Sequence, residues 1–533
     1  MTGTAAAATV RGANGMVATS QPLATAAALA VLEQGGNAID AAVTAAAVLS
    51  VTEPMMTGIG GDLFAMIWLA REQRVTALNA SGRSGSLMSI ATLARDGLTE
   101  VPRRGAKSVT VPGALAGWQE LLQRHGTMDL GQALAPAITI AERGFEPGPR
   151  TAAFWRDGDR VLRGNGEASA TFLVNGSHTP LPGERVSNPH IASTYRRIAR
   201  EGIATFYGGT LGEAIARHVQ QLGGYLTTAD LAEHRNEWVE PLAADYRGAR
   251  VHQAPPNAPG IAVLEVLRIL EGFDVRTFGH NTATCLHHLV EATRLAGADL
   301  AQFIGEPEAM ITSPTRLLTD AFIAPRRSAI APGSALPAAP PGSLLTGSDT
   351  TCLAVGDRDG NLISLINSIS ESFGSGVVVP GTGFALQNRG CGFSTTPGLA
   401  NAVAPRKRPL HTLIPALVTR PDSAGIQQPW LGLGVIGGTM QPQGQVQILV
   451  NLLDFDMDLH AAIAAPRFRH LAGNRVALEA GIPSETAAAL ATLGHDVVAP
   501  GAEFFGGAQI IARQDGAWAG ASEPRLEGRA AGY

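Results

Sequence analysis

The sequence predicts a mixed α/β protein built in layers, and three stretches of its 533 residues lead to that prediction. Residues 15–70 show strand, helix, helix and strand patterns in turn. Residues 113–325 are mostly helical in pattern, and from residue 350 onward the pattern becomes β. Because the chain is longer than one core usually supports, we expect two domains or one large layered domain.

Two helices are expected between a short first strand at residues 15–18 and a second, apolar strand at residues 63–69. The first helix, residues 22–34, is rich in Ala and Leu and ends at Gly35-Gly36, as a left-handed cap would end it. The second helix is rich in Ala and opens at Asn37. Small side chains let a helix approach a sheet closely, so these elements indicate the start of an α/β layer.

The helical middle of the chain is interrupted by a strand-like section that contains Tyr246-Arg-Gly248 and Pro255-Pro-Asn257. Residues 331–348 are dominated by Ala, Pro, Gly and Ser, which is typical of a linker. No internal repeat is visible.

A β-hairpin is expected directly after that linker. Two apolar runs, Thr350 to Val355 and Leu362 to Ser370, flank Asp359-Gly360, and Asp-Gly between apolar runs is a strong hairpin signal. A two-residue turn would place Thr350 opposite Ile369. A three-residue loop would place it opposite Ser370 and diagonal to Ser368, on the same face of the strand.

Composition excludes several classes of function. The net charge is −5 and no basic block stands out, so we expect no nucleic-acid partner. The most apolar early run, Ala41 to Val51, is too short to span a bilayer, and the N-terminus lacks a signal-peptide pattern. Three scattered cysteines show no metal-ligand spacing and fit a reducing compartment. We therefore expect a soluble cytoplasmic protein without metal or cofactor.

Thr350 is the candidate nucleophile. A threonine that becomes an amino terminus carries both a hydroxyl nucleophile and a base, its own α-amine, whose pKa of about 8 suits proton transfer. Cleavage of the Asp349–Thr350 bond would create that terminus, through attack of the Thr350 hydroxyl on the Asp349 carbonyl. Two alternatives are an ordinary strand threonine and Cys352 as nucleophile, which would place the cut two residues later.

Two further motifs have the composition of a catalytic site. Gly437-Gly438 lies in a glycine-rich stretch and would offer open backbone N–H groups to an oxyanion; the alternative is a flexible strand-to-helix turn. The stretch lacks the lysine and spacing of a phosphate loop. Arg83 follows a strand-like run and would clamp a substrate carboxylate, or else form a surface salt bridge.

Polar residues in loops after the hairpin are candidate pocket residues. Arg389, in Asn388-Arg-Gly390, and His411-Thr412 lie in glycine- and proline-rich segments. His411 is not required as a general base if the α-amine of Thr350 performs that role. His287-His288 lies in a helical run with Glu291, and we interpret it as helix surface rather than as metal ligands.

Taken together, these segments resemble the γ-glutamyltransferase family of N-terminal nucleophile hydrolases, nearly from end to end. The matching motifs occur in the family's order: Gly15-Met-Val-Ala18, Gly35-Gly-Asn-Ala-Ile-Asp40, Gly60-Gly-Asp62, Val111-Pro-Gly113, Asp349-Thr-Thr351, Asp359-Gly-Asn361, Phe373-Gly-Ser-Gly376, Gly437-Gly438, Ala465-Pro-Arg467 and Gly520-Ala-Ser-Glu-Pro-Arg525.

The resemblance implies a four-layer αββα sandwich and autocatalytic cleavage before Thr350. The products would be a large chain, residues 1–349, and a small chain, residues 350–533, held together as one folded unit. Thr350 would be the nucleophile, Ser368 would hydrogen-bond it, and the N–H groups of Gly437 and Gly438 would bind the oxyanion.

Departures from the family pattern concern the substrate. Typical members bind the glutamyl α-amine with an Asn, a Gln and an Asp, and the matching positions here are Ser370, Arg389 and Gly392. An ammonium group would face the Arg389 cation, which is repulsive. The serine pair that usually binds the α-carboxylate is His411-Thr412, and the lid loop between Phe393 and Pro405 is shortened.

These features resemble a branch of oxamate amidohydrolases and glutaryl-type cephalosporin acylases, through Asn-Arg-Gly at 388–390, His-Thr-Leu at 411–413 and Gly-Gly-Thr-Met at 437–440. We therefore expect hydrolysis of an amide whose acyl part carries a carboxylate but no α-ammonium. The alternatives are a γ-glutamyl hydrolase or transpeptidase, and an unprocessed binding protein without catalysis.

Overall fold

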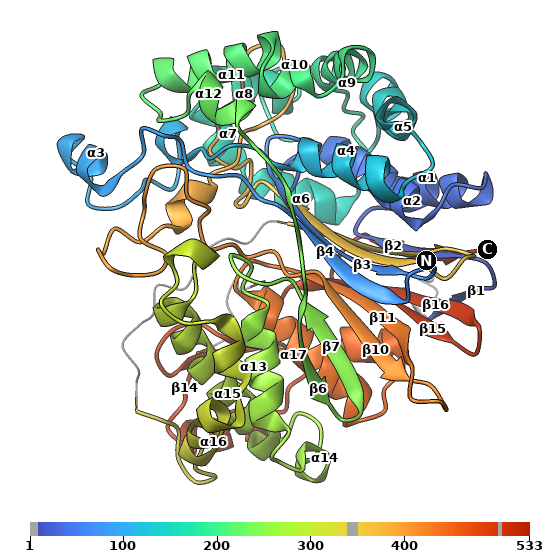
Figure 1. Ribbon diagram of the computed structural model, residues 1–533, viewed down its shortest axis with the longest axis vertical. Helices are drawn as coiled ribbons and strands as arrows, with labels where there is room; N and C mark the ends of the chain where they lie inside the picture. Colours follow the sequence, from blue (N-terminus) through green and yellow to red (C-terminus); the bar gives the residue numbers. More distant parts are fainter. Residues whose placement is uncertain (1–8, 338–349, 499–503) are drawn as a thin grey trace.

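The computed structural model describes residues 9–337, 350–498 and 504–533. Two seven-stranded sheets lie face to face, and helices cover the outer face of each (Figure 1). The chain thus folds into four layers in the order α, β, β, α, and the expected fold class is confirmed.

The first sheet contains the strands that surround Thr350, and all of its neighbouring strands are antiparallel. Its strands, in spatial order, are β17 (Arg529–Gly532), β2 (Met16–Thr19), β8 (Thr351–Gly356), β9 (Leu362–Ser368), β3 (Asp62–Leu69), β4 (Arg74–Ala80) and β5 (Glu237–Val239).

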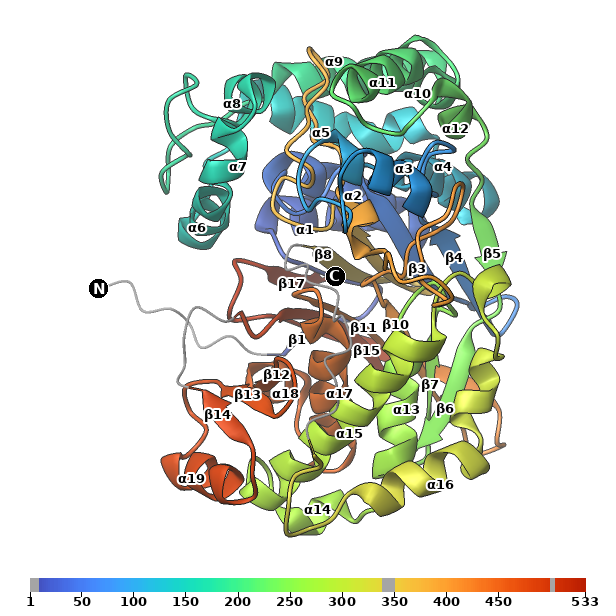
Figure 2. The ribbon, with the colours of Figure 1, turned by 90° about the vertical axis from the view of Figure 1, so that its left-hand side faces the viewer.

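The second sheet is antiparallel as well. Its order is β1 (Val10–Gly12), β16 (Ala517–Ser522), β15 (Gly507–Gln514), β11 (Gln427–Ile436), β10 (Ala416–Pro421), β7 (Ala249–Gln253) and β6 (Leu242–Tyr246). A small third sheet lies beside the second helical layer and consists of β12 (Phe468–His470), β13 (Arg475–Leu478) and β14 (Asp496–Val498) (Figure 2).

The outer layers differ in origin. The helices over the first sheet come from the first half of the chain: α1 (Pro22–Glu33), α2 (Ala38–Thr52), α4 (Ala114–His125), α5 (Leu130–Arg143), α6 (Pro149–Asp157), α7 (Asp159–Arg163), α8 (Gly166–Phe172), α9 (Pro189–Glu201), α10 (Ala204–Tyr207), α11 (Thr210–Gln221) and α12 (Thr228–Ala232), with α3 (Ile90–Arg95) to one side. Those over the second sheet are α13 (Ile261–Leu270), α14 (Val275–Phe278), α15 (Ala283–Phe303), α16 (Asp320–Ala329), α17 (Met440–Leu453), α18 (Leu459–Ala464) and α19 (Ser484–Thr492).

The N-terminal elements form where the sequence predicts them. Gly35, with φ of +96°, ends α1, because that backbone conformation is costly for residues with a Cβ. Asn37 and Asp40 form a capping box at the start of α2. Every residue of α2 is buried, and its many alanines let it pack between the first sheet and α1, α4 and α5.

Strand alternation separates two cores. Leu353 and Val355 of β8 point into the core under the first helical layer. Cys352 and Ala354 point the other way, into the core between the sheets. Thr350 precedes β8 with the parity of Cys352, so its side chain belongs to the face between the sheets.

Both predicted hairpin registers are wrong: the one with a two-residue turn by one residue, and the one with a three-residue loop by two. Thr351 pairs with Asn367 and Gly356 with Leu362, so the connecting loop has five residues, 357–361. The Asp357 carboxylate accepts hydrogen bonds from the Asp359 and Asn361 N–H groups and stabilises this wider loop. Continued by one residue, the register sets Thr350 opposite Ser368 rather than opposite Ile369 or Ser370.

The interpretation of His287-His288 as helix surface is also wrong. Both side chains are buried, because α15 packs against α13, α19 and β12. His287 hydrogen-bonds His495 at 2.8 Å and the Ala331 carbonyl at 2.9 Å. Glu291 lies close to His287 and His495. These three residues form the one group with possible metal-ligand geometry among residues 9–337, 350–498 and 504–533.

The same buried helix anchors the beginning of the predicted linker. Glu291 accepts from the Leu336 N–H, and Arg294 donates to the carbonyls of Leu336 and Pro337. Residues 338–349, which include Asp349 and most of the linker, lie outside the described residues. Segments from both sides of residue 350 contribute strands to both sheets, so they form one folded unit. In the described part of the chain, no helix is long and apolar enough to cross a membrane.

Candidate active site

Thr350 lies directly before β8 and has 1% of its surface exposed. Its Oγ1 is 3.3 Å from Ser368 Oγ at the end of the neighbouring strand β9, as the opposed register requires. Ser368 Oγ also accepts a hydrogen bond from the Ser370 N–H at 2.8 Å, in a bend where Ser370 has φ of +85°. The hydroxyl predicted to hydrogen-bond Thr350 is therefore in place, and β9 ends in a turn that holds it there.

Arg389 brings a positive charge to the same hydroxyl group. It lies in a short 3-10 helix, η4 (Arg389–Gly392), and is 3% exposed. Its guanidinium donates to Ser368 Oγ at 3.3 Å and to Thr412 Oγ1 at 2.9 Å. Burial lowers the pKa of Arg389, against the raising effect of the Asp62 carboxylate, but a guanidinium remains protonated in proteins.

The charge of Arg389 is incompletely matched. Within the described residues it forms no salt bridge, and its Nε has no hydrogen-bond partner. Glu371, an acidic side chain near it in sequence, is paired with Arg103 and Arg104. A buried cation with an unused donor is costly unless an anion joins it. The site is therefore suited to an anionic ligand beside the predicted nucleophile.

Asp62 is a buried carboxylate whose charge acts on Arg389, and its oxygens are already occupied. One oxygen accepts from the N–H groups of Gly82 and Gly113 and from the Gln387 amide, and the other accepts from His411. Burial alone would raise the pKa of Asp62, but these hydrogen bonds and the Arg389 charge hold it below its usual value.

His411 is held in one tautomer by two partners. The Leu413 N–H donates to Nδ1 at 3.2 Å, so the proton lies on Nε2, which donates to Asp62 at 3.1 Å. Burial, with the nearby Arg389 charge, lowers the pKa of His411 to about 4, so the ring is neutral. Both ring nitrogens are engaged, which leaves neither for a substrate or for proton transfer from Thr350. Thr412 accepts a hydrogen bond from Arg389, and the expected roles of His411 and Thr412 in substrate binding stay predictions.

The predicted oxyanion hole follows β11. Gly437 and Gly438 have φ of +113° and +59°, and their carbonyls accept from the Met440 and Gln441 N–H groups at the start of α17. The turn thus joins a strand to the positive end of a helix. A Cβ at Gly434 of β11 would lie 2.7 Å from Cys352 Cβ, so β11 runs against β8 and its last residues approach the end where Thr350 lies.

The remaining predicted residues take other positions. Arg83 is bound to Glu306 and Glu237 at the molecular surface, which matches the alternative salt-bridge interpretation, and a role in carboxylate binding stays a prediction. Cys352 is buried between the sheets, and burial raises the pKa of its thiol, which disfavours it as a nucleophile. The role of Ser370 in substrate binding also stays a prediction.

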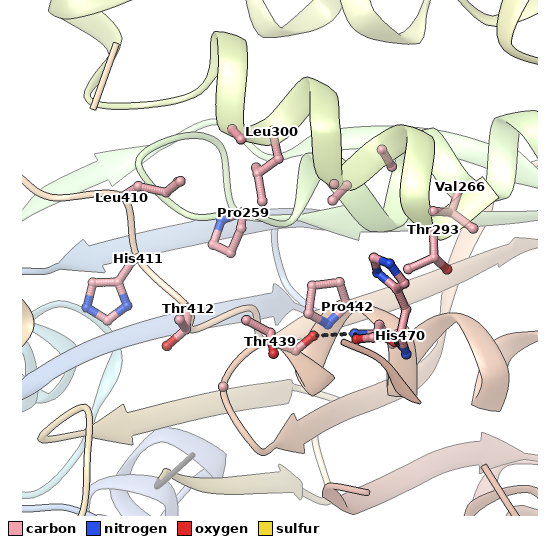
Figure 3. A pocket seen from close by; sticks show the side chains of 16 residues that line it. Pro259, Val266, Thr293, Leu300, Leu410, His411, Thr412, Thr439, Pro442 and His470 are labelled. Carbon is pink, nitrogen blue, oxygen red and sulfur yellow. Dashed lines mark hydrogen bonds between the residues drawn. The ribbon is translucent and has the colours of Figure 1, made fainter. Parts of the chain in front are cut away.

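Two features were not predicted from the sequence. Asp62 was noted within a motif but given no role, although a buried Asp after Gly-Gly at a strand start was a signal. The second feature is a cavity that extends from Thr412 and Gly438 to α13 and α15 (Figure 3). It had no sequence signal, because its lining comes from separate segments within residues 259–301 and 410–470.

The chain is similar to known proteins in both sequence and structure. A family model described as Gamma-glutamyltranspeptidase matches residues 24–533. The Glutathione hydrolase-like YwrD proenzyme of Bacillus subtilis (strain 168) is 35% identical, covering 98% of this chain and 99% of that protein. The Oxamate amidohydrolase proenzyme of Klebsiella pneumoniae is 34% identical, covering 98% of each. The solved structure of cephalosporin acylase from Bacillus halodurans is 40% identical, with a TM-score of 0.93 over 100% of this chain and 98% of that one.

Proposed function

We propose, from its membership of the gamma-glutamyltranspeptidase family of N-terminal nucleophile amidohydrolases and acyltransferases, that this chain is an amidohydrolase. Its substrates would be amides whose acyl part carries a carboxylate. The observation that carries the proposal is the buried Arg389 guanidinium, which contacts Ser368 beside Thr350 and forms no salt bridge within the described residues. A substrate carboxylate would supply the missing anion through a forked, charge-assisted pair.

The same charges argue against a substrate with an α-ammonium group. An ammonium would need a free carboxylate, but Asp62 already accepts four hydrogen bonds and Glu371 is paired with two arginines. It would also lie near the Arg389 cation, at a cost that no hydrogen bond here offsets.

Maturation would begin with attack of the Thr350 hydroxyl on the Asp349 carbonyl, which turns the peptide bond into an ester. Formation of the ester breaks the C–N bond and frees the α-amine of Thr350, and water then hydrolyses the ester to release the Asp349 carboxylate and the Thr350 hydroxyl. Proenzyme relatives support such a cut. The products would be residues 1–349 and 350–533, and because both contribute strands to both sheets, they would stay together.

In turnover, the free α-amine takes the proton of the Thr350 hydroxyl as the oxygen attacks the substrate amide. The N–H groups of Gly437 and Gly438 stabilise the oxyanion at the end of β11. The amine proton then passes to the leaving nitrogen, the C–N bond breaks, and water releases the acyl group from Thr350 by the reverse sequence. Ser368 orients the hydroxyl, and His411 takes no part in proton transfer because both its nitrogens are engaged.

A γ-glutamyl hydrolase is the second candidate, and the relative named glutathione hydrolase-like at 35% identity favours it. The test is a panel of oxamate, a glutaryl anilide and a γ-glutamyl anilide with purified, processed protein, so that the last two differ only in the acyl group. Preference for oxamate or the glutaryl amide supports the proposal. Clear preference for the γ-glutamyl compound, with acceleration by dipeptide acceptors, would overturn it.

A further inference from the structure

A cavity opens beside the predicted oxyanion hole and runs between α13 and α15 (Figure 3). His411 and Thr412 lie at one end of it, and Val266, Thr293 and His470 lie at the other (Figure 3). Gly438 is also among the lining residues. Its helical wall is apolar or small, with Ala262 from α13 and Gly297 from α15 among the lining residues.

The lining is uncharged. None of the described residues that border the cavity is Asp, Glu, Lys or Arg. It includes two histidines, His411 and His470, and burial lowers the pKa of both, to about 4 for His411. The cavity therefore suits an uncharged, mostly apolar group and would penalise a carboxylate or an ammonium ion.

The position of the cavity indicates which part of an amide substrate, the acyl arm or the amine, it would bind. The scissile carbonyl at Gly438 has two substituents, an acyl arm and an amine. If the acyl arm carries a carboxylate to Arg389, it cannot also enter a cavity without a cation. We propose that this cavity binds an apolar group on the leaving amine, so that the enzyme prefers N-alkyl or N-aryl amides to primary amides. This inference rests on the proposed function for the acyl arm only.

Substrates that share one acyl group and differ in the amine test the proposal. N-methyl and N-butyl amides have similar leaving groups but differ by three methylenes. Each buried methylene should raise kcat/KM about fourfold, so we expect the wild-type enzyme to prefer the N-butyl amide by tenfold or more. A ratio near one in the wild type would overturn the proposal without any variant.

Two variants narrow the cavity from its helical wall, Ala262→Leu on α13 and Gly297→Leu on α15. Ala298→Leu adds the same group to an exposed position of α15 and is the matched control. We expect either cavity variant to bring the N-butyl to N-methyl ratio close to one, with the N-methyl amide within about twofold of wild type. The control should keep the full ratio.

The ratio of the two kcat/KM values in the cavity variants shows whether the cavity binds the leaving amine or the acyl arm. If the cavity held the acyl arm, both amides would lose the same factor and their ratio would persist, which would refute the assignment. The series uses whichever acyl group the enzyme turns over fastest. A γ-glutamyl preference would therefore refute the proposed function and still leave the amine comparison readable. Thermal unfolding of each variant identifies a variant that fails to fold. In that case the N-butyl to N-methyl ratio of the wild-type enzyme tests the proposal by itself.

Discussion

Replacement of Arg389 by methionine tests the electrostatic basis of substrate choice. Methionine keeps an unbranched, mostly apolar side chain and removes the guanidinium that contacts Ser368 and Thr412. A carboxylate bound to a buried guanidinium makes two charge-assisted hydrogen bonds, each contributing about 1.5–3 kcal/mol. Their loss amounts to about 3–6 kcal/mol, and each 1.36 kcal/mol is a tenfold change. We expect kcat/KM for a glutaryl amide to fall by about 10²- to 10⁴-fold.

The assay compares two substrates of similar length, a glutaryl amide and the corresponding pentanoyl amide, which lacks the carboxylate. Arg389 also contacts Ser368, so Arg389→Met can slow both substrates through the nucleophile. The ratio of the two kcat/KM values cancels that effect. Arg389→Lys keeps the positive charge but loses the paired N–H donors of the guanidinium. We expect it to reduce the glutaryl-to-pentanoyl ratio of kcat/KM by about tenfold.

Stability provides the control. Removing the guanidinium gives up two hydrogen bonds but relieves the burial of a cation that has no salt-bridge partner in the described chain. We expect the free energy of unfolding to change by no more than about 1 kcal/mol. If the glutaryl-to-pentanoyl ratio stays within threefold of wild type in a folded Arg389→Met enzyme, Arg389 does not bind the substrate carboxylate.

Three more predictions follow from the site. Thr350→Ala should remain one band on a denaturing gel, while wild type gives two fragments whose smaller one begins at Thr350 by N-terminal sequencing; a fragment that begins at Cys352 would contradict the mechanism. Gly437→Ala should lower kcat by about 10²-fold in processed protein, because φ of +113° is costly for alanine and the N–H would move; unchanged kcat would exclude it from the oxyanion hole. The pKa of His411 is near 4 when folded and near 6.5 when unfolded, so stability should fall by up to about 3 kcal/mol as the pH drops from 6.5 to 4. Chemical denaturation across that range should show a smaller loss for His411→Gln than for wild type.

Local signals in the sequence located most elements of the fold. Gly35 ends α1 and the capping box at Asn37 begins α2, because these effects depend on residues within one helical turn. The hairpin was located, but its register was not. The wide loop depends on the Asp357 carboxylate, which competes with the tight Asp-Gly turn for the backbone N–H groups.

Predictions that depended on the environment of a side chain were less accurate. His287 was assigned to a helix surface, yet the segment that covers it includes His495, 208 residues away. His411 was chosen for its residue type and its loop. Only its partners, Leu413 and Asp62, show that neither ring nitrogen is available.

The sequence by itself determined the family, the α/β architecture and the short list of reactive groups, since motif order and backbone preferences are properties of neighbouring residues. Tertiary structure decided how those groups are charged and what space surrounds them. Arg389 has no salt-bridge partner in the described chain because Asp62 and Glu371 are occupied by residues far away in sequence. The apolar cavity exists because α13 and α15 pack across the Gly438 turn. Desolvation and distance act through space, so a linear sequence encodes them only through the completed fold.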